Sequence, residues 1–148
     1  TQLISSYRKG FRRPLVTGLP GDASGEQWAQ ALFAAPIAVL AHDGSPLDQG
    51  EGPRLIYANR AALSLFGLRW AEMAGMPSKL TAEPAERSSR LIALTAAQQQ
   101  TALSGYRGIR IDRHGRRFQI NNAQLWTLLG PAGESWGQGA CFSSWWWL

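Results

Sequence analysis

The last third of the chain restricts the fold more than any other part of the sequence. Residues 105–112 alternate in polarity, the turn sequence RHGR follows, and residues 116–130 form a long second alternating segment. A second turn, PAGE, precedes a third such segment at residues 135–147. Strands joined by tight turns pair as antiparallel neighbours, so this region predicts a three-stranded meander that must bury one face against other elements.

The first two thirds of the chain predicts helices and two further strands. Short apolar runs with β-branched residues predict strands at residues 37–43 and 55–57. Asn59 stands where a helix should begin, and Gly67 is placed to end that helix in a left-handed conformation. Helical spacing and capping residues predict an arm or helix over residues 1–16, and helices over 26–35, 68–77 and 81–105.

The longest predicted helix, residues 81–105, has Thr81 as its cap and Gly105 after its end. Its inner stripe is predicted to consist of Leu91, Thr95, Gln98 and Ala102. The 148 residues, 45% of them hydrophobic, suffice for one domain with a single core. The order of elements predicts an α+β fold, with helices packed on one face of a five-stranded antiparallel sheet and an N-terminal arm or helix.

Strand alternation predicts which side chains face the helices. Large apolar residues share a face with amides in both long strands, so Asn122, Gln124 and Gln138 are predicted to point inward with Trp126. Buried amides need partners, which are either protein groups in an internal network or a ligand at the polar end of a pocket. With Tyr57 added, the ligand-pocket candidates are Tyr57, Asn122, Gln124, Trp126 and Gln138. The opposite face would be covered by the N-terminal segment through Leu3, Ile4, Tyr7 and Phe11.

The sequence ends in SSWWWL, and the same alternation places Trp145 and Trp147 on the face away from the helices. Three environments are open to these indoles: the N-terminal arm, a partner protein, or a membrane surface. Tryptophan is enriched at contact hot spots, which makes both residues partner-contact candidates. Peripheral membrane contact stays open, although three residues without an amphipathic helix make a poor anchor.

Two stretches carry most of the net charge of +5. Residues 1–13 hold Arg8, Lys9, Arg12 and Arg13, and residues 105–117 hold Arg107, Arg110, Arg113, Arg116 and Arg117. These basic residues are either solvated or form a surface for an acidic partner. The candidates for a partner contact are Arg8, Arg12, Arg13, Arg113, Arg116 and Arg117. No nucleic-acid recognition motif is found, which favours a protein partner or a second copy of the chain over nucleic acid.

Residues suited to catalysis are few. The chain has one cysteine, Cys141, on a strand among small and apolar residues, and two histidines, His42 and His114. Neither a nucleophile with a base nor a metal site is visible, so the protein is predicted not to be an enzyme. No apolar run approaches the ~20 residues that span a bilayer, and no secretory signal is apparent. These features predict a cytoplasmic protein.

Several segments resemble a known family. The stretch YANRAALSLFG resembles the start of a PAS domain. A longer ordered set, ALFAAPIAVLAHD, YANRAALSLFG, MPSKLTAEP, ERSSRLIAL, GYRGIRIDRHGRRFQI, LW and GQGACF, resembles the PAS-related MEKHLA domain of stand-alone bacterial proteins and plant class III homeodomain-leucine zipper regulators. The resemblance divides the chain into an arm and loop at residues 1–27 and a PAS-like domain at 28–148. The turn LLGPAG departs from the family pattern, and WWWL lies beyond the matching segments.

The resemblance implies a PAS-like sheet with a hollow beneath its helices, and a role in sensing, ligand binding or protein pairing rather than catalysis. The flavin domains of this class share a helical Asn-Cys-Arg-Phe motif that this chain lacks, and haem-binding members use a histidine that residues 81–104 do not contain. No cofactor is therefore identified, and an unknown small-molecule ligand remains open. The sequence favours a non-enzymatic sensory or ligand-binding module that works through protein–protein contacts. The alternative is an accessory docking subunit of a larger assembly.

Overall fold

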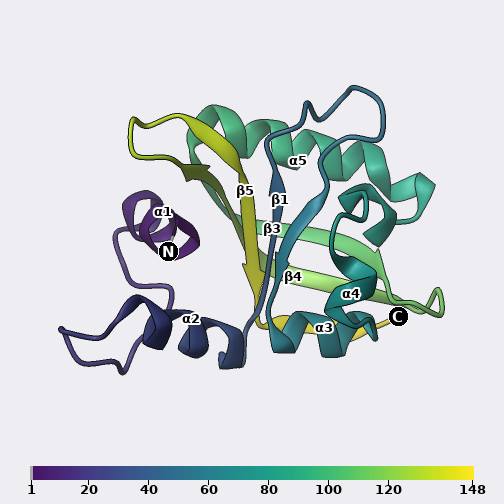
Figure 1. Ribbon diagram of the computed structural model, residues 1–148. Coiled ribbons are helices and arrows are strands. Elements are labelled where there is room, and N and C mark those ends of the chain that lie inside the picture. Colours follow the sequence, from purple (N-terminus) through teal and green to yellow (C-terminus); the bar gives the residue numbers. More distant parts are fainter. Residues whose placement is uncertain (1) are drawn as a thin grey trace.

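One antiparallel sheet forms the centre of the computed structural model, which describes residues 2–148 (Figure 1). Its strands lie in the order β2-β1-β5-β4-β3, and β6 pairs with β4 beyond the end of β5. The strands are β1 (Ala38–Asp43), β2 (Leu55–Ala58), β3 (Ala102–Ile111), β4 (Arg117–Leu129), β5 (Ser135–Phe142) and β6 (Ser144–Trp147). The helices are α1 (Gln2–Phe11), α2 (Gly25–Ala34), α3 (Arg60–Phe66), α4 (Trp70–Met73) and α5 (Arg87–Gln100), with short 3-10 helices η1 (Ser78–Thr81) and η2 (Pro84–Glu86).

The α+β fold with helices on one face of the sheet is confirmed, and an N-terminal helix covers the other face. Helices α3 and α4 pack on one face around Phe118 and Phe142, and α5 packs beside them on Leu125. Helix α1 lies against the opposite face at Trp126 (Figure 1). The N- and C-terminal ends lie on opposite sides of the molecule (Figure 1).

Helix α3 begins and ends as its sequence predicts. Asn59 Oδ1 accepts hydrogen bonds from the backbone N–H of Ala62 at 3.2 Å and of Val39 at 2.9 Å. Its amide nitrogen donates to the carbonyl oxygens of Ile37 at 2.7 Å and Leu32 at 3.2 Å. Asn59 therefore caps α3 and also joins it to the end of α2 and the start of β1. Gly67, with φ of 69°, ends the helix in the left-handed conformation.

A break in strand phase sets the side-chain directions of the long strands. Gln124 pairs with Cys141 and Asn121 with Ser144, so β5 and β6 follow β4 in one register. Between these pairs Asn122 adopts φ of 54°, a left-handed conformation that asparagine tolerates better than most residues. Because of this residue, the two halves of β4 present opposite alternations to the helices.

Helix α5 is shorter than the predicted helix and is rotated about its axis. Residues 84–86 form η2, Thr81 lies in η1, and Thr101, with φ of 70°, turns the chain into β3 at Ala102. The predicted inner stripe of Leu91, Thr95, Gln98 and Ala102 was wrong. The buried stripe consists of Arg90, Ala93, Leu94 and Ala97. The predicted stripe did not include Arg90, which belongs to a residue type that is mostly exposed in proteins.

Within residues 2–148, every helix is too short or too polar to cross a membrane. Helix α1 and Val16 pack on the same sheet as the rest of the chain. The predicted division of the chain at residue 27 stays a prediction.

Candidate functional site

A cavity of about 70 Å³ lies between α5, η1 and the sheet. Its wall is mostly apolar and includes Leu40, Leu55, Phe66, Ile120 and Phe142. Polar side chains enter it from five elements: His42 from β1, Ser78 and Thr81 from η1, Arg90 from α5, Tyr106 and Arg110 from β3, and Gln138 from β5. An apolar cavity with a few convergent polar groups is the usual form of a small-molecule site.

The polar groups are joined in a chain of hydrogen bonds that begins and ends on α5. Arg90 Nη2 donates to Ser78 Oγ at 2.6 Å, and Ser78 Oγ lies 3.2 Å from His42 Nδ1. His42 Nε2 lies 3.1 Å from Gln138 Oε1, and Gln138 Nε2 donates to the Leu94 carbonyl at 2.9 Å. Since Gln138 donates to a carbonyl, its oxygen accepts from His42 Nε2–H, and His42 Nδ1 accepts from the Ser78 hydroxyl. The four bonds therefore have one donor-to-acceptor direction.

His42 is held neutral in this chain. Burial lowers the pKa of His42 from 6.5 to about 4, and the positive charge of Arg90 acts in the same direction. The hydrogen bond to Gln138 and the charge of Asp43 oppose the shift and are smaller. A neutral imidazole has one donor and one acceptor nitrogen, which is what the two partners of His42 require.

We expect His42 to make stability fall at acidic pH. Its folded pKa is depressed below the unfolded value, so its contribution is complete above pH 6.5 and is lost as the pH falls toward 4. The difference between 6.5 and about 4 corresponds to about 3 kcal/mol. Urea unfolding at pH 7.5 and pH 4 should show this loss in the wild type and a clearly smaller loss in His42→Gln. Equal losses in both proteins would contradict it.

Of the predicted pocket residues, Gln138 lines this cavity. The predicted inward direction of Asn122, Gln124 and Trp126 was wrong, because the left-handed Asn122 reverses the alternation of β4. Trp126 is fully buried against α1, with its ring centroid 5.0 Å from that of Tyr7. Tyr57 also packs on the α1 side of the sheet, and burial raises the pKa of its hydroxyl.

Asn122 and Gln124 border a second cavity, of about 310 Å³, on the α1 side of the sheet. Gln124 Oε1 accepts from the Tyr7 hydroxyl at 2.6 Å and lies 3.5 Å from Cys141 Sγ. Burial raises the pKa of the Cys141 thiol to about 12, so the thiol is protonated at neutral pH and is a poor nucleophile. Cys141 is buried among apolar residues, as its sequence context predicts. Any role of these residues in ligand binding stays a prediction.

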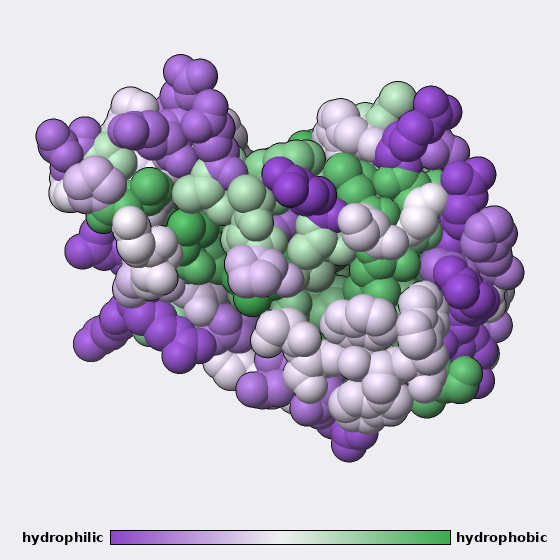
Figure 2. Space-filling view, turned by 90° about the horizontal axis from the view of Figure 1, so that it is seen from below, coloured by the Kyte–Doolittle hydropathy of each residue, from purple (hydrophilic) through white to green (hydrophobic). Residues whose placement is uncertain are grey.

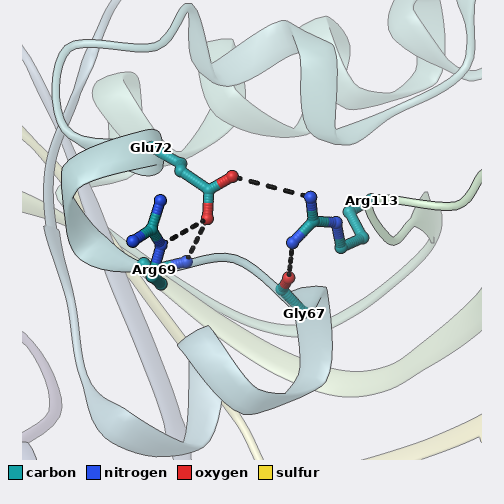
Figure 3. Close-up of polar contacts among 4 residues, drawn as sticks. All are labelled: Gly67, Arg69, Glu72 and Arg113. Atoms are coloured by element: carbon teal, nitrogen blue, oxygen red, sulfur yellow. Dashed lines mark hydrogen bonds and ion pairs between the residues drawn. The ribbon is translucent and has the colours of Figure 1, made fainter.

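The arginines of the β3–β4 hairpin have partners within the chain. Arg113 donates to the Gly67 carbonyl at 3.2 Å and lies 3.7 Å from Glu72 Oε2, which ties the hairpin turn to the α3–α4 connection (Figure 3). Arg116 pairs with Asp112 at 2.7 Å, and Arg117 pairs with Glu83 at 2.8 Å. These contacts give all three arginines a structural role. A contact with a partner stays a prediction for them.

The N-terminal arginines lie at the end of α1 and just after it. Arg8, Arg12 and Arg13 are exposed, and Arg13 Nε donates to the Tyr7 hydroxyl at 3.3 Å. Their role as a docking surface likewise stays a prediction.

The tryptophans of β6 lie at the border of the helix face. Trp145 and Trp147 lie opposite Ile120 and Phe118, with ring centroids 5.9 Å and 5.7 Å from that of Phe118. Their predicted direction away from the helices was wrong, because the break at Ser143 reverses the alternation. They remain 36% and 44% exposed, and Trp146 on the opposite face is 42% exposed. The view from below shows a broad apolar and near-neutral area bordered by hydrophilic residues (Figure 2).

Six polar residues of the α5 cavity were not among the predicted pocket residues: His42, Ser78, Thr81, Arg90, Tyr106 and Arg110. A signal for Arg90 exists in the spacing of Arg90, Ala93, Leu94 and Ala97, which form one helical stripe. Arg110 lies between Ile109 and Ile111, and strand alternation places it on the face opposite these two apolar residues. Both this position and the charge of arginine predict exposure, so the sequence gives no signal for the burial of Arg110.

Solved structures with a similar fold belong to the PAS class. A PAS domain from Colwellia psychrerythraea has a TM-score of 0.63 and 18% identity, covering 78% of this chain and 92% of that chain. An RNA-binding Light-Oxygen-Voltage receptor has a TM-score of 0.62 and 24% identity over 86% of this chain, which corresponds to 36% of that receptor. A Light-Oxygen-Voltage domain studied with a flavin analogue has a TM-score of 0.62 and 15% identity, covering 82% and 84% of the two chains. At these identities the likeness establishes the fold.

Flavin does not fit the residues of this chain. The α5 cavity holds about 70 Å³, whereas pockets for drug-sized ligands are roughly 300–1,000 Å³. Cys141 lies on the opposite side of the sheet, against the α1 cluster. Two buried arginines occupy the space instead.

The remaining comparisons concern sequence. None of the curated proteins matches the chain. The sequence profile of the MEKHLA domain matches residues 1–147, which includes α1 and continues through β6 to Trp147. The chain therefore belongs to the MEKHLA domain family.

Proposed function

We propose that the protein is a non-enzymatic sensory module that binds a small molecule in the α5 cavity and signals through contacts with another protein. The observation that carries this proposal is the hydrogen-bond chain from Arg90 to Leu94, which crosses the cavity and joins α5 to β1 and β5. A ligand that takes over one of these bonds changes the position of α5 relative to the sheet. Residues Ser144–Trp147 continue directly from β5, so such a change lies close to an exposed tryptophan surface.

A cavity-filling variant tests the ligand-binding part. Ala140 lines the cavity, and Ala140→Leu adds about three carbon atoms to a space of about 70 Å³, which leaves too little room for a ligand. Ala71→Leu on the exposed side of α4 is the matched control. Native mass spectrometry of gently purified protein should show the same additional mass on the wild type and Ala71→Leu, and none on Ala140→Leu. A wild-type protein that carries no additional mass when purified from its natural host would overturn the ligand-binding proposal.

A docking role is the second candidate, and the exposed indoles of β6 favour it. Each is between 36% and 44% exposed, and Arg116 stacks over Trp147 at 4.7 Å from the ring centroid. Buried tryptophan and arginine contribute strongly at protein interfaces. Sedimentation of the wild type and of Trp146→Ser separates the occupants: a wild-type dimer that dissociates in the variant indicates self-association. A monomer in both proteins argues against a second copy as the partner.

A further inference from the structure

Two arginines inside the α5 cavity are buried. Arg90 of α5 is 9% exposed and Arg110 of β3 is 8% exposed, and both line the cavity. Burial, together with the positive charge of Arg110, lowers the pKa of Arg90 to about 10. Arg90 therefore remains protonated at neutral pH despite its burial.

Neither arginine has an acidic partner among residues 2–148. The guanidinium of Arg90 donates to Ser78 Oγ at 2.6 Å. The guanidinium of Arg110 donates to the Ile109 carbonyl and the Tyr106 hydroxyl, both at 3.0 Å. The ion pairs of the described chain involve other arginines, on the surface. Buried charges in proteins are ordinarily paired, so two like charges facing one cavity leave it in need of an anion.

The size and wall of the cavity restrict the kind of anion. Its volume of about 70 Å³ has room for a ligand of only a few heavy atoms, since one water needs roughly 10–15 Å³ of such volume. Most of the remaining wall is formed by apolar side chains such as Leu55, Phe66 and Ile120. The other polar side chains of the wall, His42, Ser78, Thr81 and Gln138, already have hydrogen-bond partners within the chain. An inorganic oxyanion would leave polar oxygens against this wall, whereas a short hydrocarbon tail matches it.

We propose that the α5 cavity binds a short-chain aliphatic carboxylate, with its carboxylate group between Arg90 and Arg110 and its tail against the apolar wall. This inference rests on the proposed ligand-binding function and assigns the ligand class. The planar guanidinium offers donors in a fork that matches carboxylate geometry. One N–H group of Arg90 donates to Ser78, and its other N–H groups can donate to the carboxylate. The carboxylate is therefore bound at the start of the hydrogen-bond chain that crosses the cavity.

Isothermal titration calorimetry at pH 7 with acetate, propionate and butyrate tests the proposal, with butyramide and inorganic phosphate as comparison probes. We expect the best of the three carboxylates to bind at least tenfold more tightly than either comparison probe. Arg90→Met and Arg110→Met should each weaken carboxylate binding at least tenfold. Arg107→Met, at an exposed position of the same strand β3, should leave it unchanged.

Stability supplies a second, independent readout. Without ligand, Arg90→Met should melt at a temperature no lower than the wild type, because it removes an unpaired buried charge and keeps an unbranched side chain in place. If Arg90→Met fails to fold, Arg110→Met carries the test.

Three results would overturn the assignment: equal binding of butyramide and butyrate, equal or tighter binding of phosphate, or an equal loss in Arg107→Met. Absence of carboxylate binding to the wild type would also overturn it. The ligand-binding function itself is judged separately by the mass retained on the wild type and absent from Ala140→Leu. A retained neutral molecule would therefore remove the carboxylate assignment and leave the sensory proposal standing.

Discussion

Asn59→Ala should destabilise the protein by about 3–5 kcal/mol, since it removes an N-cap worth ~1 kcal/mol and leaves several buried backbone groups without partners at ~1–3 kcal/mol each. Asn59 is fully buried, and its amide bonds to the backbone of Val39, Ala62, Ile37 and Leu32. Total stabilities of small domains are only about 5–15 kcal/mol, so a large part of the protein should unfold near room temperature in mild denaturant. Equilibrium urea unfolding measures this change.

Asn59→Asp tests the donated bonds of Asn59 apart from its accepted bonds, and Asn121→Ala is the surface control. Asn59→Asp keeps both accepted bonds and loses the donated ones, and its carboxylate then faces the carbonyl oxygens of Leu32 and Ile37, so we expect it to be strongly destabilised as well. Asn121→Ala, which loses one bond of 3.5 Å to Ser144 at the sheet surface, should cost less than about 1 kcal/mol. A loss of stability in Asn59→Ala no greater than that in Asn121→Ala would contradict this prediction. It would show that the bonds of Asn59 to α2, β1 and α3 contribute no more than one surface hydrogen bond.

Trp126→Ala should destabilise the protein by about 3–5 kcal/mol, the usual cost of removing a large buried aromatic side chain. Trp126 is fully buried, and its ring contacts Tyr7 and Phe11 of α1 at centroid distances of 5.0 Å and 6.2 Å. The contacts left between α1 and β4 are then those of smaller apolar side chains such as Leu3 and Leu128, and the bond from Leu129 N–H to Ser6 Oγ at 2.8 Å. The rate of amide hydrogen exchange should therefore increase more in α1 than in the strands of the sheet.

The matched control is Trp136→Ala, which removes an indole that is 49% exposed and should cost less than about 1 kcal/mol. Trp126→Phe should be much milder than Trp126→Ala, because the Trp126 indole N–H has no hydrogen-bond partner in the described chain and its loss leaves nothing unsatisfied. Unchanged hydrogen exchange in α1 of Trp126→Ala would mean that α1 is held on the sheet by other contacts.

Local chemistry made much of this fold predictable. Asn59 and Gly67 bound α3 because an amide can accept from the first helical turn and a glycine can adopt positive φ, and neither property depends on the rest of the chain. The N-terminal helix was also predictable, since Leu3, Tyr7 and Phe11 recur at helical spacing and supply the cover that the outer face of the sheet requires. The membership of the family followed from ordered segments and is confirmed by the profile match.

The site was less predictable, for two physical reasons. A single positive φ at Asn122 places each later residue of β4 on the face opposite the one that alternation predicts. The pattern of polar and apolar residues gives no sign of this change. This one residue moved Gln124 and Trp126 from the predicted pocket to the α1 side. Arg90 was missed because its helical spacing indicated burial while its charge indicated solvent. Arg110 was missed because it alternates with Ile109 and Ile111, so both its strand position and its charge indicated solvent.

The hydrogen-bond chain across the cavity has a spectroscopic consequence. Both ends lie on α5, one helical turn apart, so the chain closes a loop that includes the imidazole of His42. An anion that draws Arg90 away from Ser78 removes a charged donor from the serine hydroxyl, which weakens the hydrogen bond that this hydroxyl donates to His42 Nδ1. The nitrogen chemical shifts of this one imidazole thus act as an internal indicator of cavity occupancy, recorded without any added dye or label at the site.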